Sequence, residues 1–159
     1  MFGPDWDEGC PSCSFWADGF DGAGVHLAHR DASFVCVSRA PYSRLDAYKA
    51  RMRWSFPWFS SAPSDFNFNF GVSFTPEQCE SGGDYNFVHL DYPPEEAPGL
   101  SAFAMHESGD IFHTYSTYSR GLDPINPAYQ LHDLAPRGRD EDNLAWTMEW
   151  LRRHDAYDD

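Results

Sequence analysis

Cys10 and Cys13 stand on either side of Pro11-Ser12, at the point where the sequence predicts the start of a helix. Proline suits the first helical position, because its missing N–H would have no partner there. The apolar residues that follow recur at helical spacing; they are Trp16, Phe20, Ala23 and Leu27. We therefore expect one helix from Pro11 to about Leu27, with Cys10 at its N-terminal cap.

The next stretch has the pattern of an α/β protein. The continuous apolar run Phe34–Val37 predicts a strand covered on both faces. Pro41 starts a second helix whose inner side carries Leu45, Tyr48 and Met52. The order helix, buried strand, helix indicates an α/β fold.

The second half of the chain gives weaker patterns. In Phe66–Phe70, phenylalanine alternates with asparagine as in a strand, and prolines and glycines in Thr75–Gly99 predict a long loop. Leu100–Met105 and Ile111–Tyr118 predict a hairpin with its turn at 107–110.

Near the C-terminus the sequence predicts a short helical turn over 128–134 and a final helix from Asp142 or Asn143. This helix would turn Leu144, Met148 and Leu151 inward and place Arg152, Arg153 and His154 at its C-terminal end, where cations are favoured. No repeat or second domain is evident, so we expect a single domain over 1–159.

Composition excludes several classes of partner. The formal net charge is −14, which repels nucleic acid and anionic lipid, since these are bound through clustered Lys and Arg. No apolar run approaches a membrane span and no signal-peptide pattern opens the chain, so a cytoplasmic protein is expected. Four cysteines are too few for a disulfide-built scaffold and favour a redox or metal role for the Cys-x-x-Cys pair.

The dithiol suggests a specific chemistry. Backbone amides at the start of the helix would stabilise a Cys10 thiolate, which attacks a substrate disulfide before Cys13 resolves the mixed disulfide. Upstream carboxylates oppose this, namely Asp5, Asp7 and Glu8. A helix terminus contributes roughly 0.3–1 kcal/mol and one carboxylate at about 4 Å in water roughly 1 kcal/mol the other way. The sequence leaves the sign of the pKa shift open.

A zinc site is the less favoured interpretation, because it needs a second pair of ligands. Cys36 and Cys79 are isolated from each other, and His26 and His29 lie too far along the chain from the dithiol. We expect neither a metal nor another cofactor.

The element order resembles the thioredoxin-like fold. The match is closest to the DUF899 family of thioredoxin-like proteins, which are predicted dithiol-disulfide oxidoreductases. The strings that carry it cover nearly the whole chain; they are FGPDWDEGCPSCSFWADGFDGAGVHLAHRDASFVCVSRAPYSRLDAYKARMRWSFPWFSS, DFNFNFGVSF, HTYSTYSRGLD and WLRRHDAYDD. The resemblance implies a mixed sheet flanked by helices, with Cys10 as the exposed nucleophile and Cys13 as the resolving cysteine.

The chain departs from the thioredoxin pattern at several places. Pro-Ser replaces Gly-Pro between the cysteines, and Glu8-Gly9 stands where a tryptophan is common. The cis-proline that faces the dithiol in this fold has Pro98 as its nearest candidate, a substrate-facing residue, although Gly99 intervenes before the hairpin. Residues 1–9 carry no strand pattern, so we expect a truncated or misassigned start that leaves the first central strand unfilled.

The sequence is compatible with three functions. The leading one is a thiol-disulfide oxidoreductase acting on protein or small-molecule thiols and disulfides. A peroxidase-like thiol protein is an alternative. The sequence has no arginine near Cys10 to activate peroxide, which counts against it. A non-catalytic binding module would instead use the Thr75–Gly99 segment with Tyr115 and Tyr118. The sequence predicts neither the substrate nor the oligomeric state.

Overall fold

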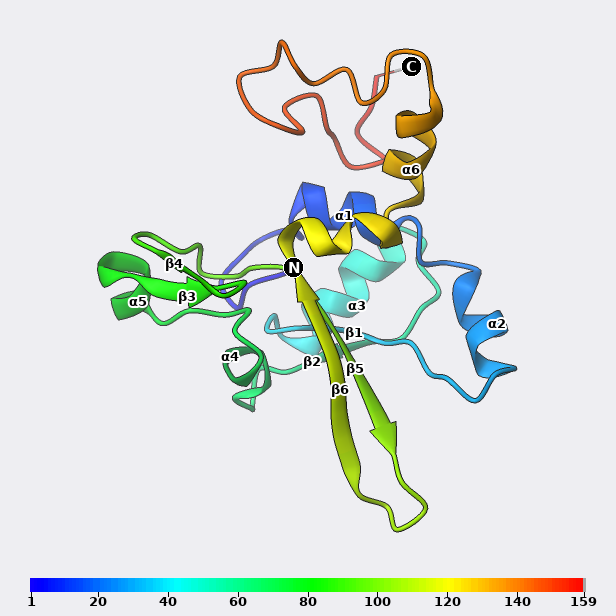
Figure 1. Ribbon diagram of the computed structural model, residues 1–159, viewed down its shortest axis with the longest axis vertical. Coiled ribbons are helices and arrows are strands. Elements are labelled where there is room, and N and C mark those ends of the chain that lie inside the picture. The colour runs from blue at the N-terminus through cyan, green and yellow to red at the C-terminus, as the bar shows by residue number, and fades with distance from the viewer. Residues whose placement is uncertain (159) are drawn as a thin grey trace. The chain divides into compact units, whose positions relative to one another are not determined.

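The computed structural model describes residues 1–158 and divides them into two compact units (Figure 1). One unit consists of Met1–Asp65 together with the chain from Ile125 onward, and the other is Phe66–Pro124. Helices are mixed with short strands, which form three separate two-stranded sheets among the described residues. This is an α/β fold, as expected. The single domain over 1–159 stays a prediction.

The first unit contains a parallel strand pair joined by a helix. Its elements are α1 (Pro11–Ala17), α2 (Ala23–Ala28), β1 (Cys36–Ser38), α3 (Tyr42–Arg51), β2 (Trp58–Ser60) and α6 (Pro127–Leu134). β1 pairs with β2 in parallel, with Cys36 opposite Trp58 and Ser38 opposite Ser60. α3 connects the two strands and contacts β2, which makes a βαβ unit.

An aromatic core holds this unit together. α3 begins after Pro41 and buries Leu45 and Tyr48, and Met52 at its C-terminal cap is buried as well, which confirms the predicted inner side. These residues join other buried aromatic side chains, namely Phe2, Trp54, Phe56 and Trp58. Burying one such side chain contributes roughly 1.5–3 kcal/mol, so this core contributes substantially to the stability of the unit.

The predicted N-terminal helix is shorter than expected. α1 ends at Ala17 and a separate helix, α2, begins at Ala23. Gly22 precedes α2 with φ of 87°, a left-handed conformation that a continuous helix does not contain. Leu27, predicted to face inward, is exposed. Residues 1–9 form no strand, as predicted, and β1 pairs with β2 alone within the described residues.

The predicted C-terminal helix does not form. Residues 140–157 adopt turns and bends, with Asp140 and Met148 at φ of 53° and 69°, which breaks the helical repeat. The segment is ordered instead by Glu141, whose Oε1 accepts hydrogen bonds from the Tyr129 hydroxyl and Trp150 Nε1, both at 2.8 Å, and from the Met148 amide at 3.1 Å. Preceding it, α6 confirms the helical turn predicted near 128–134.

The second unit is built around a long hairpin. Its elements are α4 (Phe66–Asn69), α5 (Pro76–Ser81), β3 (Gly83–Tyr85), β4 (Val88–Leu90), β5 (Gly99–Met105), β6 (Ile111–Tyr118) and most of the 3-10 helix η1 (Ser119–Ile125). β5 and β6 pair antiparallel, and the His106 amide closes the turn on the Asp110 carbonyl at 2.8 Å. The predicted hairpin is confirmed.

Two predictions for the second unit are wrong. Phe66–Asn69 is a helix rather than a strand. The segment predicted as a loop over Thr75–Gly99 contains α5 and the β3–β4 hairpin. Thr75 caps α5 by accepting from the Gln78 amide at 3.2 Å, while its own amide donates to Gln78 Oε1 at 2.9 Å. This reciprocal capping box is a sequence signature for a helix start.

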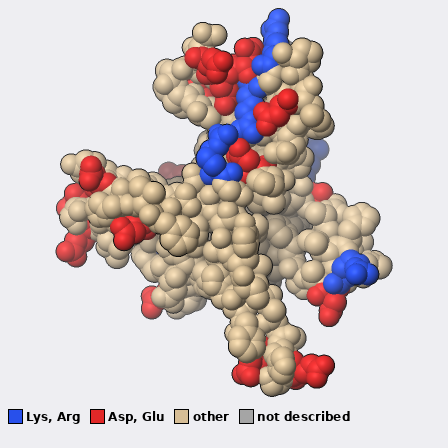
Figure 2. Space-filling model, viewed as in Figure 1, with Lys and Arg blue, Asp and Glu red and all other residues tan. Residues whose placement is uncertain are grey.

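Charge is unevenly spread over the surface. On the face shown in Figure 2, acidic side chains gather at the tip of the β5–β6 hairpin, where the turn carries Glu107 and Asp110. Between residues 66 and 124 the sequence contains Arg120 and no other Lys or Arg. Separately, none of the helices in the described part of the chain is long and apolar enough to cross a membrane.

Replacing the Glu141 carboxylate tests its role in the C-terminal segment. We expect Glu141→Ala to lower the free energy of unfolding by about 1–3 kcal/mol, because it leaves three donors without their acceptor. Asp142→Ala, at the exposed neighbouring carboxylate, is the control and should stay within about 0.5 kcal/mol of wild type. Urea unfolding followed by tryptophan fluorescence measures both; equal effects would contradict the role of Glu141.

Candidate functional site: a dithiol at the start of α1

The dithiol lies where the sequence predicts it, at the first turn of α1. Cys10 is the N-cap residue with φ of −56° and ψ of 127°, and Pro11 takes the first helical position. The Cys10 amide donates to the Met1 carbonyl at 3.1 Å, and the Cys10 carbonyl accepts from the Ser14 amide at 3.0 Å. Cys10 and Cys13 are both half-buried and both are free thiols.

The two thiols have pKa values that move in opposite directions. The pKa of Cys10 is lowered to about 5, chiefly by a hydrogen bond from the Cys13 thiol, against the opposing effect of burial; the positive α-amino group of Met1 and the amides of Cys13 and Ser12 contribute to the same lowering. The same hydrogen bond and burial raise the pKa of Cys13 well above its ordinary value. The sequence left the direction of the Cys10 pKa shift open, and in the structure this pKa is lowered.

This shift links the site to stability. The pKa of Cys10 is lower in the folded chain than the ordinary value of a thiol, so its ionisation stabilises the fold. That contribution is complete above the ordinary thiol pKa of about 8.5 and is lost as the pH falls toward 5.

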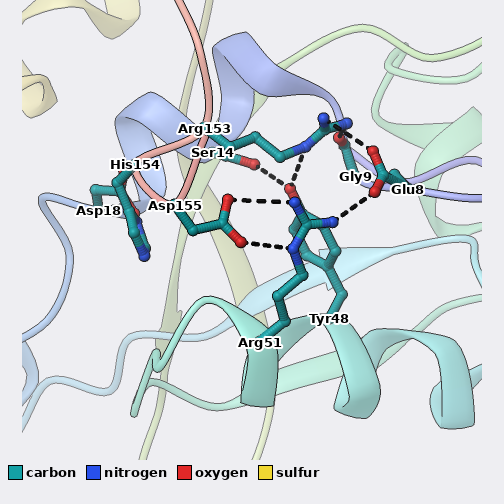
Figure 3. A network of polar contacts seen from close by, with 9 residues as sticks. All are labelled: Glu8, Gly9, Ser14, Asp18, Tyr48, Arg51, Arg153, His154 and Asp155. Atoms are coloured by element: carbon teal, nitrogen blue, oxygen red, sulfur yellow. Dashed lines mark hydrogen bonds and ion pairs between the residues drawn. The ribbon is translucent and has the colours of Figure 1, made fainter. Parts of the chain in front are cut away.

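Glu8, the nearest of the upstream carboxylates in the sequence, is paired with arginines from distant parts of the chain (Figure 3). Glu8 Oε1 pairs with Arg51 Nη1, and Glu8 Oε2 pairs with Arg153 Nη1 at 2.9 Å. Arg51 also binds Asp155, with Nε to Oδ2 at 2.6 Å. The nearest upstream carboxylate therefore no longer acts as an isolated negative charge beside Cys10.

There is a steric reason for a glycine before Cys10. A Cβ added at Gly9 would lie 2.7 Å from Cε1 of Tyr48, so any side chain there would overlap the buried ring. The packing of Tyr48 therefore favours glycine at position 9.

A chain of hydrogen bonds ends on the backbone of Cys10. Arg153 Nε donates to the Tyr48 hydroxyl at 2.9 Å, the Tyr48 hydroxyl lies 2.9 Å from Ser14 Oγ, and Ser14 Oγ donates to the Cys10 carbonyl at 2.9 Å. Arg153 Nη2 also donates to the Gly9 carbonyl at 2.8 Å. Sequence reasoning missed Tyr48 and Arg153 as site residues, and no local pattern links positions so far apart.

The other candidate ligands do not join the dithiol in a metal site. Cys36 lies in β1, and burial raises its pKa to about 12. His26 belongs to α2, and Cys79 to α5 in the second unit. Across residues 1–158, no group of three or more His, Cys, Asp or Glu side chains is arranged to hold a metal ion.

A family model described as "Bacterial protein of unknown function (DUF899)" matches residues 1–157. The chain belongs to the DUF899 family. Comparison with curated proteins gives no match, and comparison with solved structures gives none either. For this DUF899 protein, the dithiol is therefore the feature that bears on activity.

Pro98 does not have the geometry that the resemblance implies. The peptide bonds of residues 1–158 are all trans, including the bond before Pro98, so the expected cis-proline is not found there. Pro98 lies in the second unit just before β5, and its carbonyl accepts from the Tyr85 hydroxyl at 2.7 Å. A substrate-facing role for Pro98 stays a prediction.

The pKa of Cys10 can be tested by alkylation. We expect the rate of Cys10 modification by iodoacetamide to fall with a midpoint near pH 5, because the thiolate is the reactive form. Cys13→Ala should raise the midpoint toward that of an ordinary thiol, since it removes the donor, whereas Cys13→Ser retains an O–H donor and should raise it less. Mass spectrometry of the Cys10 peptide measures each rate; equal midpoints for the two variants would contradict the role of this hydrogen bond.

Proposed function

We propose that this DUF899 protein is a thioredoxin-like thiol-disulfide oxidoreductase, with Cys10 as the nucleophile and Cys13 as the resolving cysteine. The observation that carries the proposal is the pair of free thiols at the start of α1 whose pKa values are shifted in opposite directions. A thiolate at neutral pH beside a protonated thiol is the state required for disulfide exchange.

The first step forms a mixed disulfide. The Cys10 thiolate attacks one sulfur of a substrate disulfide; the substrate S–S bond breaks, and the departing thiolate takes a proton from solvent. One substrate half is then joined to Cys10, and the other has left as a thiol. Cys10 and the bound half share the remaining disulfide bond, which the second step must break.

Cys13 completes the reaction. Its pKa is raised chiefly by the hydrogen bond with Cys10, and this effect ends when the Cys10 sulfur loses its negative charge in the mixed disulfide. Cys13 then loses its proton more readily and attacks Cys10 Sγ, which expels the second substrate thiol. The protein dithiol is oxidised by two electrons, the substrate disulfide is reduced to two thiols, and an external thiol reductant restores the dithiol.

The arrangement of the first unit supports the thioredoxin-like part of the proposal. The dithiol lies at the start of α1, and the parallel β1–α3–β2 unit follows, which is the order expected for that fold. A peroxidase-like reaction has less support. Arg153 does reach the dithiol loop, but its three guanidinium nitrogens are engaged by Glu8, Gly9 and Tyr48.

Turnover of a disulfide tests the proposal directly. We expect wild type to reduce a small aromatic disulfide in the presence of a dithiol reductant, and Cys10→Ser to lose this activity because the nucleophile is gone. Cys13→Ser should accumulate a mixed disulfide on Cys10, detectable by mass spectrometry. Cys36→Ala is the matched control, and its activity should equal that of wild type. Undiminished turnover by Cys10→Ser would refute the mechanism.

The redox potential provides a second test. A lowered Cys10 pKa stabilises the reduced protein relative to its disulfide and makes the dithiol more oxidising. Dithiol proteins whose nucleophile has a pKa near 7 and near 3.5 have potentials of about −270 and −120 mV. We expect a potential between these values for the Cys10–Cys13 pair, measured by equilibration with glutathione buffers; a value below about −270 mV would contradict this expectation.

A further inference from the structure

We propose that Arg153 is a positioning residue for the dithiol, because it fixes the backbone on both sides of Cys10. The inference rests on the proposed function of Cys10 as the nucleophile. Arg153 is separated from Gly9 by 144 positions and reaches it from the irregular C-terminal segment (Figure 3). It touches neither thiol in any described contact, so its effect is indirect.

The first contact is made on the N-terminal side of the nucleophile. Arg153 Nη2 donates to the Gly9 carbonyl at 2.8 Å, which is the carbonyl of the peptide bond that leads into Cys10. Arg153 Nη1 binds Glu8 Oε2 at 2.9 Å one residue earlier. One guanidinium therefore holds two successive residues in the planar geometry that arginine favours.

The second contact is made through two hydroxyls, and their donor directions are determined. A guanidinium can only donate, so the Tyr48 oxygen accepts from Arg153 Nε. Ser14 Oγ gives its proton to the Cys10 carbonyl, so the Tyr48 hydroxyl must donate to Ser14 Oγ. The chain thus runs from Arg153 to the carbonyl of Cys10 with every hydroxyl proton used, and hydrogen bonds in such a chain polarise and strengthen one another.

Arg153 is itself held in place by its neighbours. Leu151 is buried, Asp155 binds Arg51 through Nε at 2.6 Å, and His154 Nδ1 lies 2.7 Å from Asp18 Oδ1. The Arg153 side chain is 18% exposed, so water has limited access to its hydrogen bonds. Because residues 150–157 form no regular element, these contacts determine where the guanidinium lies.

Backbone placement matters for the thiolate because amide donors stabilise it. The amides of Ser12 and Cys13 lie in the first turn of α1 and help to lower the pKa of Cys10, an effect that depends on the N-cap conformation of this residue. Arg153 restrains the carbonyls before and after that residue, which limits rotation of the peptide units on both sides. Removing these restraints should weaken the effect of the amides and raise the pH at which Cys10 becomes reactive.

Charge and hydrogen bonding must be separated in the test. The charged or titratable groups near the loop are Glu8, Arg51, Asp155, Cys13, Cys36 and the α-amino group of Met1. Arg153→Met removes both the charge and the donors. Tyr48→Phe breaks the chain to Cys10 without changing any charge, and Arg153→Lys keeps the charge but loses the planar array of donors.

Arg152→Met is the matched control. Arg152 is the preceding residue, yet its Nη1 donates to carbonyls of its own segment, those of Glu149 and Leu151. Loss of an arginine from this segment is therefore common to both methionine variants, whereas loss of the contacts to the dithiol loop is specific to Arg153.

The experiment measures the pH midpoint of Cys10 alkylation by iodoacetamide, with thermal unfolding followed in parallel. We expect Arg153→Met to raise the midpoint by at least about one pH unit, which lowers the rate at pH 5 about fivefold. Tyr48→Phe and Arg153→Lys should shift it in the same direction by less, and Arg152→Met should leave it at the wild-type value.

The inference is overturned if folded Arg153→Met keeps the wild-type midpoint, or if Arg152→Met shifts it equally. Should Arg153→Met not fold, Tyr48→Phe decides, and an unshifted midpoint in that variant refutes the hydrogen-bond chain. No disulfide substrate enters this assay. Absence of disulfide turnover in wild type would therefore count against the proposed function while leaving the positioning role to be judged by alkylation alone.

Discussion

The buried side chain of Tyr48 joins the core of the first unit to its chemistry. Its ring packs edge-on against Phe2 and Trp54, with centroids 5.5 and 5.7 Å away. Its hydroxyl lies in the polar chain that connects Arg153 to the first turn of α1. A displacement of α3 within the aromatic core would therefore move the hydroxyl that is hydrogen-bonded to Ser14 and Arg153. Under the proposed function, the packing of the core and the reactivity of Cys10 are coupled through this one residue.

Features carried by nearby residues could be predicted from the sequence. The start of α1 follows from Pro11 beside Cys10, and the buried side of α3 follows from apolar residues spaced by three or four positions. The β5–β6 hairpin needs only two β-prone runs and a turn containing Gly109, which adopts φ of 89°. In each case the interactions that form the element lie within a few residues of one another.

Features that depend on distant contacts could not be predicted in the same way. Leu144, Met148 and Leu151 have helical spacing, yet hydrogen bonds to Glu141 and a positive φ at Met148 replace the helix there. The alternation over Phe66–Asn69 fits a strand, but the residues form one helical turn. The lowered pKa of Cys10 depends on geometry at the cap, and the pairing of Glu8 depends on arginines remote in sequence. The capping box at Thr75, by contrast, is a local signal for the start of α5.

The separation between Gly9 and Arg153 has a consequence for biosynthesis. A ribosome that adds about 5–20 residues per second needs roughly 7 to 29 seconds to travel the 144 positions between them. During that interval the nascent chain exposes Cys10 without the guanidinium that completes its surroundings. Under the proposed role of Arg153, premature oxidation of the growing polypeptide would thus be slowed by the order in which its parts emerge, and a fully reactive thiol would arise only after Arg153 has been added.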